Sequence, residues 1–197
     1  MVVGRPKQFE RNDALAAAMD VFWTKGYEAT SVQDLVDAMG VNRGSIYDTF
    51  GDKHSLFIEA VEHYLGDHAN SLTEKLNAGR TPLAGIQGFF NMVVDGLSCT
   101  DCCRGCLITN AAVELAPHDE EVAKVVQRFL KAAEKAFQNH LELAIEEGEI
   151  PEDSDARSLA RFLLMSLQGL VVMGKASVGK ATLKDAVRTT LSALTRG

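Results

Sequence analysis

The chain has 197 residues, a length that fits one domain with an ordinary core or a small module joined to a larger one. Hydrophobic residues make up 46% and charged residues 24%, a composition that excludes a disordered protein. The formal net charge of -7 excludes a protein that coats nucleic acid by overall charge, so any DNA binding is expected to be local and salt-sensitive.

The N-terminal residues and the most apolar window of the sequence both favour a cytoplasmic protein. The N-terminus places charged residues ahead of any apolar run, which is not the architecture of a secretory signal. The most apolar window, residues 159–174, carries Arg161 and Gln168 and falls short of the roughly 20 residues that a membrane span needs. We therefore expect no membrane partner. In a reducing cytoplasm, the four cysteines are expected to be thiols or metal ligands rather than permanent disulfides.

Apolar residues recur at helical spacing almost throughout, and no segment shows the alternation of a strand, so we expect an all-α fold. The pattern predicts helices over about residues 12–25, 31–39, 43–49, 53–77, 82–97, 106–115, 119–147, 155–175 and 182–194. The first three would form a helix-turn-helix module over residues 1–52, and residues 53–197 a larger helical regulatory and dimerisation body.

Local signals mark the ends of these early helices. Gly26 and Gly40 are expected to end the first and second helices. Ser31 and Asp34 have the spacing of a capping box, and Asp52 is expected to cap the long helix that follows the module.

Two short helices joined by a glycine-containing turn, after a third helix, indicate helix-turn-helix DNA binding. We expect Arg43 to pair with guanine, Gly44 to allow close approach of the backbone, and polar side chains nearby to bond phosphates. Asp48 is less expected on this helix. Three interpretations of it stay open: it accepts a hydrogen bond from a cytosine amine, it caps locally, or it points away from the DNA. The predicted DNA-binding residues are Thr30, Ser31, Arg43, Gly44, Ser45, Tyr47, Thr49 and Lys53.

This stretch resembles the TetR family of transcriptional regulators from about Phe9 to Phe57. The residues that carry the resemblance include Phe22, Gly26-Tyr27, Thr30, Gly40-Val41, Gly44, Tyr47, Phe50, Lys53 and Leu56. The resemblance implies a homodimer that binds a double-stranded DNA operator through two successive major grooves and usually represses nearby genes. It also implies an unknown small-molecule effector bound by the C-terminal helices. Asp48-Thr49 departs from the Tyr-His or similar pair of many members, which leaves the DNA preference there open.

All four cysteines lie within eight residues, at Cys99, Cys102, Cys103 and Cys106. Weak helix formers around them favour a loop that enters a helix at Cys106. There the helix dipole and Arg104 would favour a reactive thiolate, so the four cysteines are the candidate sensor. Gly105-Cys106-Leu107 and Glu114-Leu115-Ala116 also resemble a branch of the family in which some members sense electrophiles or oxidants through cysteine.

Three interpretations of the cysteines stay open: a redox or electrophile switch, a metal sensor, and partly buried thiols beside a separate organic-ligand site. The alternative classes for the whole protein are a cysteine-dependent thiol oxidoreductase and a metal-binding protein. No βαβ pattern or catalytic constellation supports an enzyme. We therefore expect no enzyme, no cofactor and no assigned metal site.

The resemblance favours an apolar effector pocket over plain core packing for one group of residues, Phe89, Phe90, Met92, Val93 and Ile108. We expect the homodimer to form through the last two helices. Its predicted apolar contacts are Leu159, Phe162, Leu163, Leu170, Met173, Leu183, Val187, Leu191 and Leu194.

Overall fold

The computed structural model describes residues 10–98 and 104–195, and every regular element in these two ranges is a helix. The prediction of an all-α fold is confirmed. The helices are α1 (Arg11–Lys25), α2 (Val32–Met39), α3 (Arg43–Phe50), α4 (Lys53–Asn77), α5 (Pro82–Leu97), α6 (Leu107–Glu114), α7 (Glu120–Glu146), α8 (Ala156–Lys175) and α9 (Lys180–Ser192).

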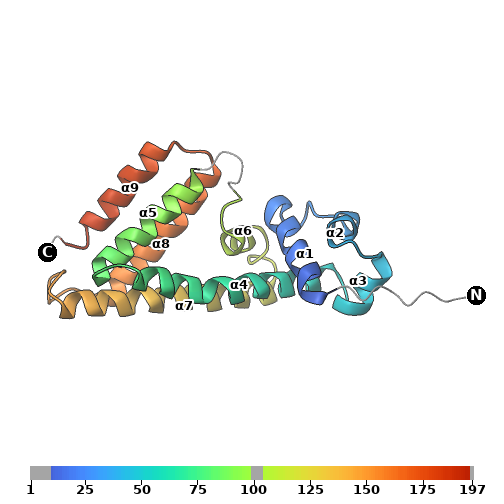
Figure 1. Ribbon diagram of the computed structural model, residues 1–197, viewed down its shortest axis with the longest axis horizontal. Helices are drawn as coiled ribbons and strands as arrows, with labels where there is room; N and C mark the ends of the chain where they lie inside the picture. Colours follow the sequence, from blue (N-terminus) through green and yellow to red (C-terminus); the bar gives the residue numbers. More distant parts are fainter. Residues whose placement is uncertain (1–9, 99–103, 196–197) are drawn as a thin grey trace, which may run out of the picture.

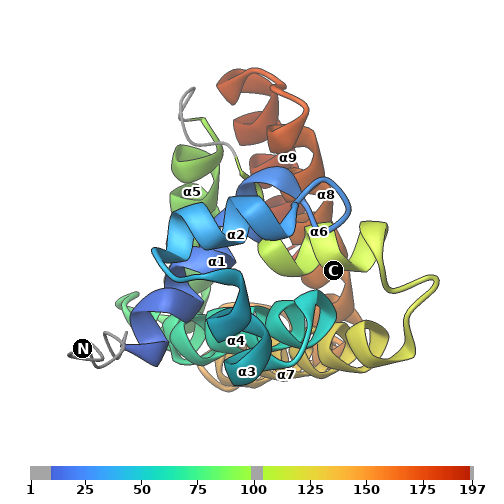
Figure 2. The same ribbon diagram turned by 90° about the vertical axis from the view of Figure 1, so that its right-hand side faces the viewer.

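The two longest helices, α4 and α7, lie side by side and form the base of the molecule (Figure 1). Helices α1 to α3 stand at one end of this base, and α5, α8 and α9 rise from the other. Helix α6 lies between the two ends, in contact with α1, α4, α7 and α8. The view onto the α1–α3 end shows α2 and α3 in front, so these two helices lie on the outside of the molecule (Figure 2).

Buried side chains form two cores, one toward each end. The first joins α1, α2 and α3 to α6 and the early parts of α4 and α7, and Phe22 meets Phe57 edge to face at 5.1 Å inside it. The second joins α5, α8 and α9 to the rest of α7, around Phe90 and Phe137. The first core therefore extends past residue 52, so the predicted division at residues 52 and 53 is not a division between cores.

The local signals at the helix ends are confirmed. Ser31 and Asp34 form a reciprocal capping box at the start of α2, and Gly40 ends that helix with φ 65°. Asp52 caps α4 through the backbone N–H of Ser55. A positive φ is the left-handed conformation that glycine adopts without a steric penalty, which explains why Gly40 can turn the chain directly into α3.

Helix α8 agrees with the predicted range of residues 155–175 and extends beyond the apolar window at residues 159–174. It has 20 residues with a mean hydropathy of 1.3, enough to cross a membrane by length and composition alone. Leu163 and Ala160 on this helix are fully buried in the second core, and α8 packs against α7. A core helix passes the same test of length and hydropathy, because its inner face must be apolar.

The contacts predicted for a dimer need correction. Of these, Leu163, Leu170, Leu183, Val187 and Leu194 are buried inside the protomer. All five lie in the second core. Leu163 and Leu170 belong to α8, which packs against α7, and Leu183 and Val187 belong to the apolar stripe of α9, which packs on α5 and α8 of its own chain. The large apolar side chains that α8 leaves exposed are Phe162, Met165, Val172 and Met173.

Candidate nucleic-acid interface

Helix α3 is held by the turn that separates it from α2. Gly40 closes α2, and the Asn42 side chain then caps α3 by accepting a hydrogen bond from the Ser45 backbone N–H at 2.8 Å. Ile46 and Phe50 on the inner side of α3 are 1% and 4% exposed. These two anchors fix which side of the helix faces outward.

The predicted contact residues on α3 lie around this outer side. Arg43, Gly44, Tyr47 and Thr49 are exposed, and Ser45 is half-buried. Arg43 donates a hydrogen bond to the Tyr47 hydroxyl at 3.2 Å, and its guanidinium lies over the Tyr47 ring. The structure therefore places the α3 residues of the predicted set on one outer surface, although their roles in DNA contact stay predictions.

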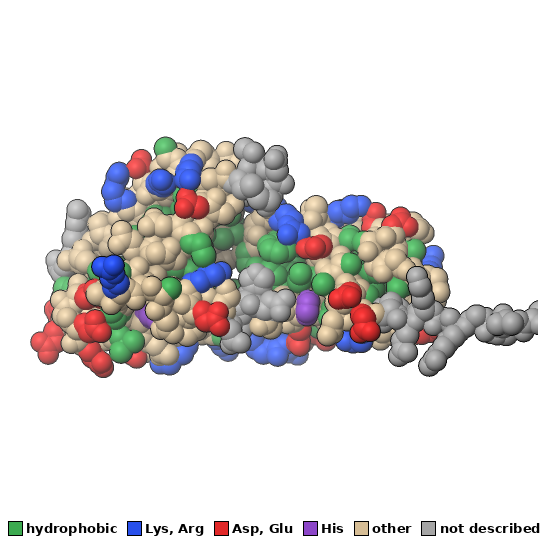
Figure 3. Space-filling view, viewed as in Figure 1, with side chains coloured by type: hydrophobic (Ala, Val, Ile, Leu, Met, Phe, Trp, Pro, Cys, Tyr) green, Lys and Arg blue, Asp and Glu red, His purple; other side chains and the backbone are tan. Residues whose placement is uncertain are grey.

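The distribution of cations distinguishes two positions on the module. Arg11 pairs with Glu59, and Lys25 pairs with Asp34 at 2.6 Å. Among the described residues, Arg43 and Lys53 form no ion pair, and Lys53 lies with its ammonium 4.3 Å from the centre of the Tyr27 ring. Charged side chains of both signs are interspersed over this end of the molecule (Figure 3). Free positive charge at the edges of α3 is the kind that attracts phosphate.

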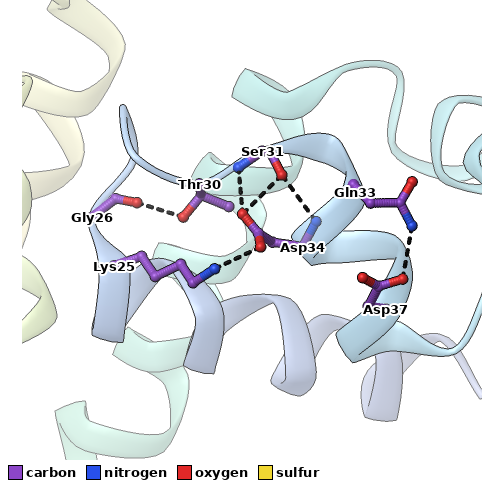
Figure 4. Close-up of polar contacts among 7 residues, drawn as sticks. All are labelled: Lys25, Gly26, Thr30, Ser31, Gln33, Asp34 and Asp37. Carbon is purple, nitrogen blue, oxygen red and sulfur yellow. Dashed lines mark hydrogen bonds and ion pairs between the residues drawn. The ribbon is translucent and has the colours of Figure 1, made fainter.

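Two predicted contacts at the start of α2 differ in their surroundings (Figure 4). The Thr30 side chain is 1% exposed, and its hydroxyl donates to the Gly26 carbonyl at 2.5 Å. The prediction that Thr30 contacts DNA is therefore corrected to a structural role, because a buried hydroxyl bonded to the backbone does not reach a phosphate. Ser31 is exposed and donates its hydroxyl to Asp34 at 2.8 Å.

Asp34 joins α2 to the end of α1. Its carboxylate accepts hydrogen bonds from the Lys25 ammonium and from the backbone and hydroxyl of Ser31 (Figure 4). The hydrogen bond from Lys25, followed by those from Ser31, lowers the pKa of Asp34 from 3.8 to about 2. This charged group therefore fixes α2, and through it α3, relative to α1.

Three of the four predicted sensor residues, Cys99, Cys102 and Cys103, lie outside the described residues. Cys106 is a free thiol, half-buried, and is the N-cap of α6. The Tyr64 hydroxyl donates to its Sγ at 3.6 Å. Burial, and then the neighbouring Cys106, raises the pKa of Tyr64, so this hydroxyl keeps its proton. Cys106 thus lies at the start of a helix, as predicted.

Arg104 and Gly105, which immediately precede Cys106, contact α1 in a set of residues that we call the junction: Asp20, Trp23, Arg104 and Gly105. Trp23 donates its indole N–H to the Gly105 carbonyl at 3.1 Å. Arg104 lies over the Trp23 ring at 4.2 Å and bonds Asp20 at 2.7 Å. The positive charge of Arg104 therefore engages α1. Gly105 has φ 70°, the left-handed region that favours glycine.

A second link joins the other end of α6 to the module. The two carboxylate oxygens of Glu114 accept hydrogen bonds from the backbone N–H groups of Tyr27 and Glu28, at 3.1 and 2.9 Å. These groups lie in the turn between α1 and α2, beside Gly26. Helix α6 therefore contacts the DNA-binding module at both of its ends.

The predicted pocket residues fall into different environments. Phe89 and Phe90 are buried in the second core, Val93 packs against it, and Met92 is 40% exposed. Ile108 of this set lines an apolar cavity of about 430 Å³ between α6, α7 and α8. The structure thus does not bring these five residues together around a single described cavity, and their pocket role stays a prediction.

A larger cavity, of about 470 Å³, lies between α1, α6 and α8. It combines apolar residues with the polar side chains of Thr24, Asn110 and Lys175, and Lys175 donates to Asn110 at 2.9 Å. Within the described parts of the chain, no group of three or more histidine, cysteine and acidic side chains is placed to hold a metal ion.

Sequence reasoning missed the residues that join the module to the body. Trp23 meets Gly105 across 82 positions of sequence, and Glu114 meets Tyr27 across 87. No local pattern predicts such pairs. The sole tryptophan of the chain is the one signal in the sequence for an unusual contact on this helix.

Two family comparisons cover most of the chain. Residues 14–60 match the family described as bacterial regulatory proteins, tetR family, and residues 82–190 match the tetracyclin repressor-like C-terminal domain. The chain is 37% identical over 193 residues to YezE of Bacillus subtilis (strain 168), an uncharacterized HTH-type transcriptional regulator, covering 98% of this chain and 100% of YezE. It is 30% identical over 189 residues to the HTH-type transcriptional repressor ComR of Escherichia coli (strain K12), covering 95% and 90%.

Solved structures agree. The fold matches CifR, a TetR family regulator solved as a triple cysteine variant with a 26-base-pair operator duplex, with a TM-score of 0.86 and 33% identity over 97% of this chain and 100% of that chain. The reduced form of NemR from E. coli shares the fold, with a TM-score of 0.82 and 18% identity over 91% and 94%. The chain therefore belongs to the TetR family and is a DNA-binding transcriptional regulator.

Proposed function

We propose that the protein is a cytoplasmic, non-catalytic repressor that binds its operator as a homodimer and is released when its cysteine segment is modified. The observation that carries the proposal is the junction, in which Trp23 of the DNA-binding module donates to Gly105, next to Cys106. A chemical change at Cys106 therefore occurs next to a residue, Gly105, that is hydrogen-bonded to α1.

The DNA-binding half rests on the outer surface of α3 and on two cations, Arg43 and Lys53, that form no ion pair with any described residue. The relative CifR is bound to operator DNA in its solved structure. CifR has the same fold as this chain and 33% sequence identity to it. In a homodimer, the two α3 helices would enter successive major grooves, which requires a fixed spacing between them. The exposed Phe162, Met165 and Val172 of α8 supply an apolar face for that dimer.

The release half follows from the position of Cys106. When its thiolate, having lost its proton to solvent, adds to a maleimide, a C–S bond forms as the C=C π bond breaks, and the carbon next to the carbonyl takes a proton from solvent. When the thiolate attacks peroxide, an S–O bond forms as the O–O bond breaks and hydroxide leaves. The half-buried Sγ lies against the Tyr64 hydroxyl, and Trp23 packs edge to face on the Tyr64 ring at 5.0 Å. A bulky group on this sulfur displaces Tyr64 or the loop, and either movement disturbs Trp23. Helix α1 then shifts the module away from the spacing that DNA requires.

The test uses the full-length, fully reduced protein and fluorescently labelled DNA from the region upstream of its own gene. Binding is followed by anisotropy before and after mild peroxide or an electrophile such as a maleimide. We expect binding to be lost on treatment and, for peroxide, restored by excess thiol. Trp23 fluorescence, the signal of the only tryptophan, should change over the same range of treatment.

Two variants separate the parts of the proposal. Cys106→Ser should bind DNA when reduced and lose the response if Cys106 is the modified residue. Trp23→Phe keeps a ring but removes the indole donor, so it should bind DNA and respond less. DNA binding that treatment leaves unchanged would assign sensing to an organic effector or a metal and contradict the release half. Absence of binding to any DNA would contradict the DNA-binding half.

A further inference from the structure

Asp48 places a negative charge on the helix that is expected to meet DNA, itself a polyanion. It lies two residues after Ile46 and two before Phe50, both of which are buried. Two residues correspond to roughly 200° around an α-helix, so Asp48 points directly away from the core. Its side chain is exposed. The carboxylate therefore stands at the centre of the face that α3 presents to a partner.

Of the five other aspartates of the module, four have a partner within the protein, and Asp13 on α1 has none among the described residues. Asp20 bonds Arg104, Asp34 bonds Lys25, Asp37 accepts from Gln33, and Asp52 caps α4. In the described residues, Asp48 holds no hydrogen bond or ion pair, and Asn42 rather than Asp48 caps α3. Local capping therefore does not explain this carboxylate.

Gly44 lies one helical turn before Asp48 on the same face. A Cβ atom added at Gly44 would meet only the Asn42 Oδ1 at 3.2 Å, so the outward side of the backbone is open there. No side chain at this position holds α3 away from a groove floor. A short aspartate one turn later can therefore come within hydrogen-bond distance of base edges.

The chemistry of the major groove restricts what a carboxylate can contact. Phosphates repel it, and the hydrogen-bond donors that base edges present are the N4 amine of cytosine and the N6 amine of adenine. In adenine, the adjacent N7 is an acceptor and repels a carboxylate, whereas cytosine has no acceptor beside its amine. We propose that Asp48 accepts a hydrogen bond from cytosine N4 in each half of the operator and sets the base preference there. This inference rests on the DNA-binding function of the chain.

The test requires no known operator. Reduced full-length protein selects duplexes from a random pool, and the enriched sequences are compared for the wild-type chain, Asp48→Ala and Asp48→Asn. The matched control is Asp37→Asn, which removes the same charge from the module but keeps an oxygen acceptor for Gln33.

We expect cytosine at one position of each half-site for the wild type and for Asp37→Asn. Asp48→Ala should lose this preference and bind duplexes that lack the cytosine at least as tightly as the wild type does, because a charge that repels phosphate is gone. Asp48→Asn should shift the preference to adenine, whose N6 and N7 match an amide. Replacing the cytosine should weaken wild-type binding by roughly 5- to 150-fold and hardly affect Asp48→Ala.

A chemical probe adds a second readout. N4-methylcytosine that still pairs with guanine has a methyl group where its major-groove N–H was. It should weaken the wild type as much as a base change, and leave Asp48→Ala unaffected. An identical enriched sequence for all four proteins would overturn the role of Asp48 and leave DNA binding intact. Failure of the wild type to enrich any sequence would overturn the DNA-binding function and this inference together.

Discussion

The outer face of α3 and the junction differ in how their polar groups are satisfied. On α3, Arg43 and Asp48 are exposed and have no ion-pair partner among the described residues. At the junction, Arg104 is paired with the Asp20 carboxylate and lies over the Trp23 ring. The Trp23 indole N–H donates to the Gly105 carbonyl. Charges left unpaired on an ordered helix are available to another molecule, whereas paired groups hold two parts of one chain together. The comparison separates the surface that reads DNA from the contact that positions it.

The largest expected effect comes from the core beneath both regions. Phe22→Ala removes a ring that is 1% exposed and packs on Phe57. We expect the free energy of unfolding to fall by about 3–5 kcal/mol, measured by urea denaturation followed by circular dichroism. Leu143→Ala, on a side chain that is 44% exposed, is the control and should change it by under about 0.5 kcal/mol. Similar values for the two variants would show that the surfaces do not share this core.

Arg43→Ala tests the α3 face alone. We expect it to lose about 1–3 kcal/mol of binding free energy on the preferred duplex and to relax base preference, measured by anisotropy on a panel of duplexes. Lys53→Ala should weaken binding to all duplexes alike and reduce the slope of log affinity against log salt by about 1. Stability should be unaffected in both. Unchanged affinity in both variants would contradict the assignment of this surface to DNA.

Glu114→Ala tests the second link between α6 and the module. It leaves the part-buried backbone N–H of Tyr27 without its acceptor, which costs about 1–3 kcal/mol, whereas the exposed N–H of Glu28 can bond water instead. Hydrogen exchange of these two amides should become faster, as measured by NMR. Glu114→Gln retains one oxygen acceptor and should show a smaller change. Amide exchange as slow as in the wild type would mean that the carboxylate does not hold this turn.

The smallest effect is a pH dependence of the module. The pKa of Asp34 is lowered in the folded chain, chiefly by the hydrogen bond from Lys25. A carboxyl with a depressed pKa stabilises the fold above its unfolded pKa, and this contribution is lost as pH falls through its folded pKa. The loss should lie between about pH 4 and about pH 2. In Asp34→Asn, the urea concentration at the unfolding midpoint should change less with pH over this range than it does in the wild type. An equally strong pH dependence in the variant would show that other carboxyls dominate acid unfolding.

Much of the fold could be predicted from short-range patterns. The capping box at Ser31, the turn at Gly40 and the cap at Asp52 depend on residues within four positions of one another. The same holds for the outer face of α3, because Ile46 and Phe50 define its inner side by spacing alone. The prediction failed for Thr30, since its burial depends on how the chain folds back onto Gly26.

The dimer contacts show the limit of patterns in the body. The apolar stripe of α9 was visible in the sequence, but a stripe does not state its partner. Leu183 and Val187 pack on their own chain, while Phe162 remains exposed. The choice depends on the relative positions of α5, α8 and α9, which no single helix specifies.

By itself, the sequence determined the all-helical class, the helix-turn-helix module and its family, because these depend on local spacing and caps. Only the tertiary structure decided that Trp23 meets Gly105, that Glu114 holds the turn after α1, and that Cys106 lies against Tyr64. These contacts join residues more than 40 positions apart. They form only when the two cores have packed along α4 and α7. A pattern of neighbouring residues in the sequence cannot predict that packing.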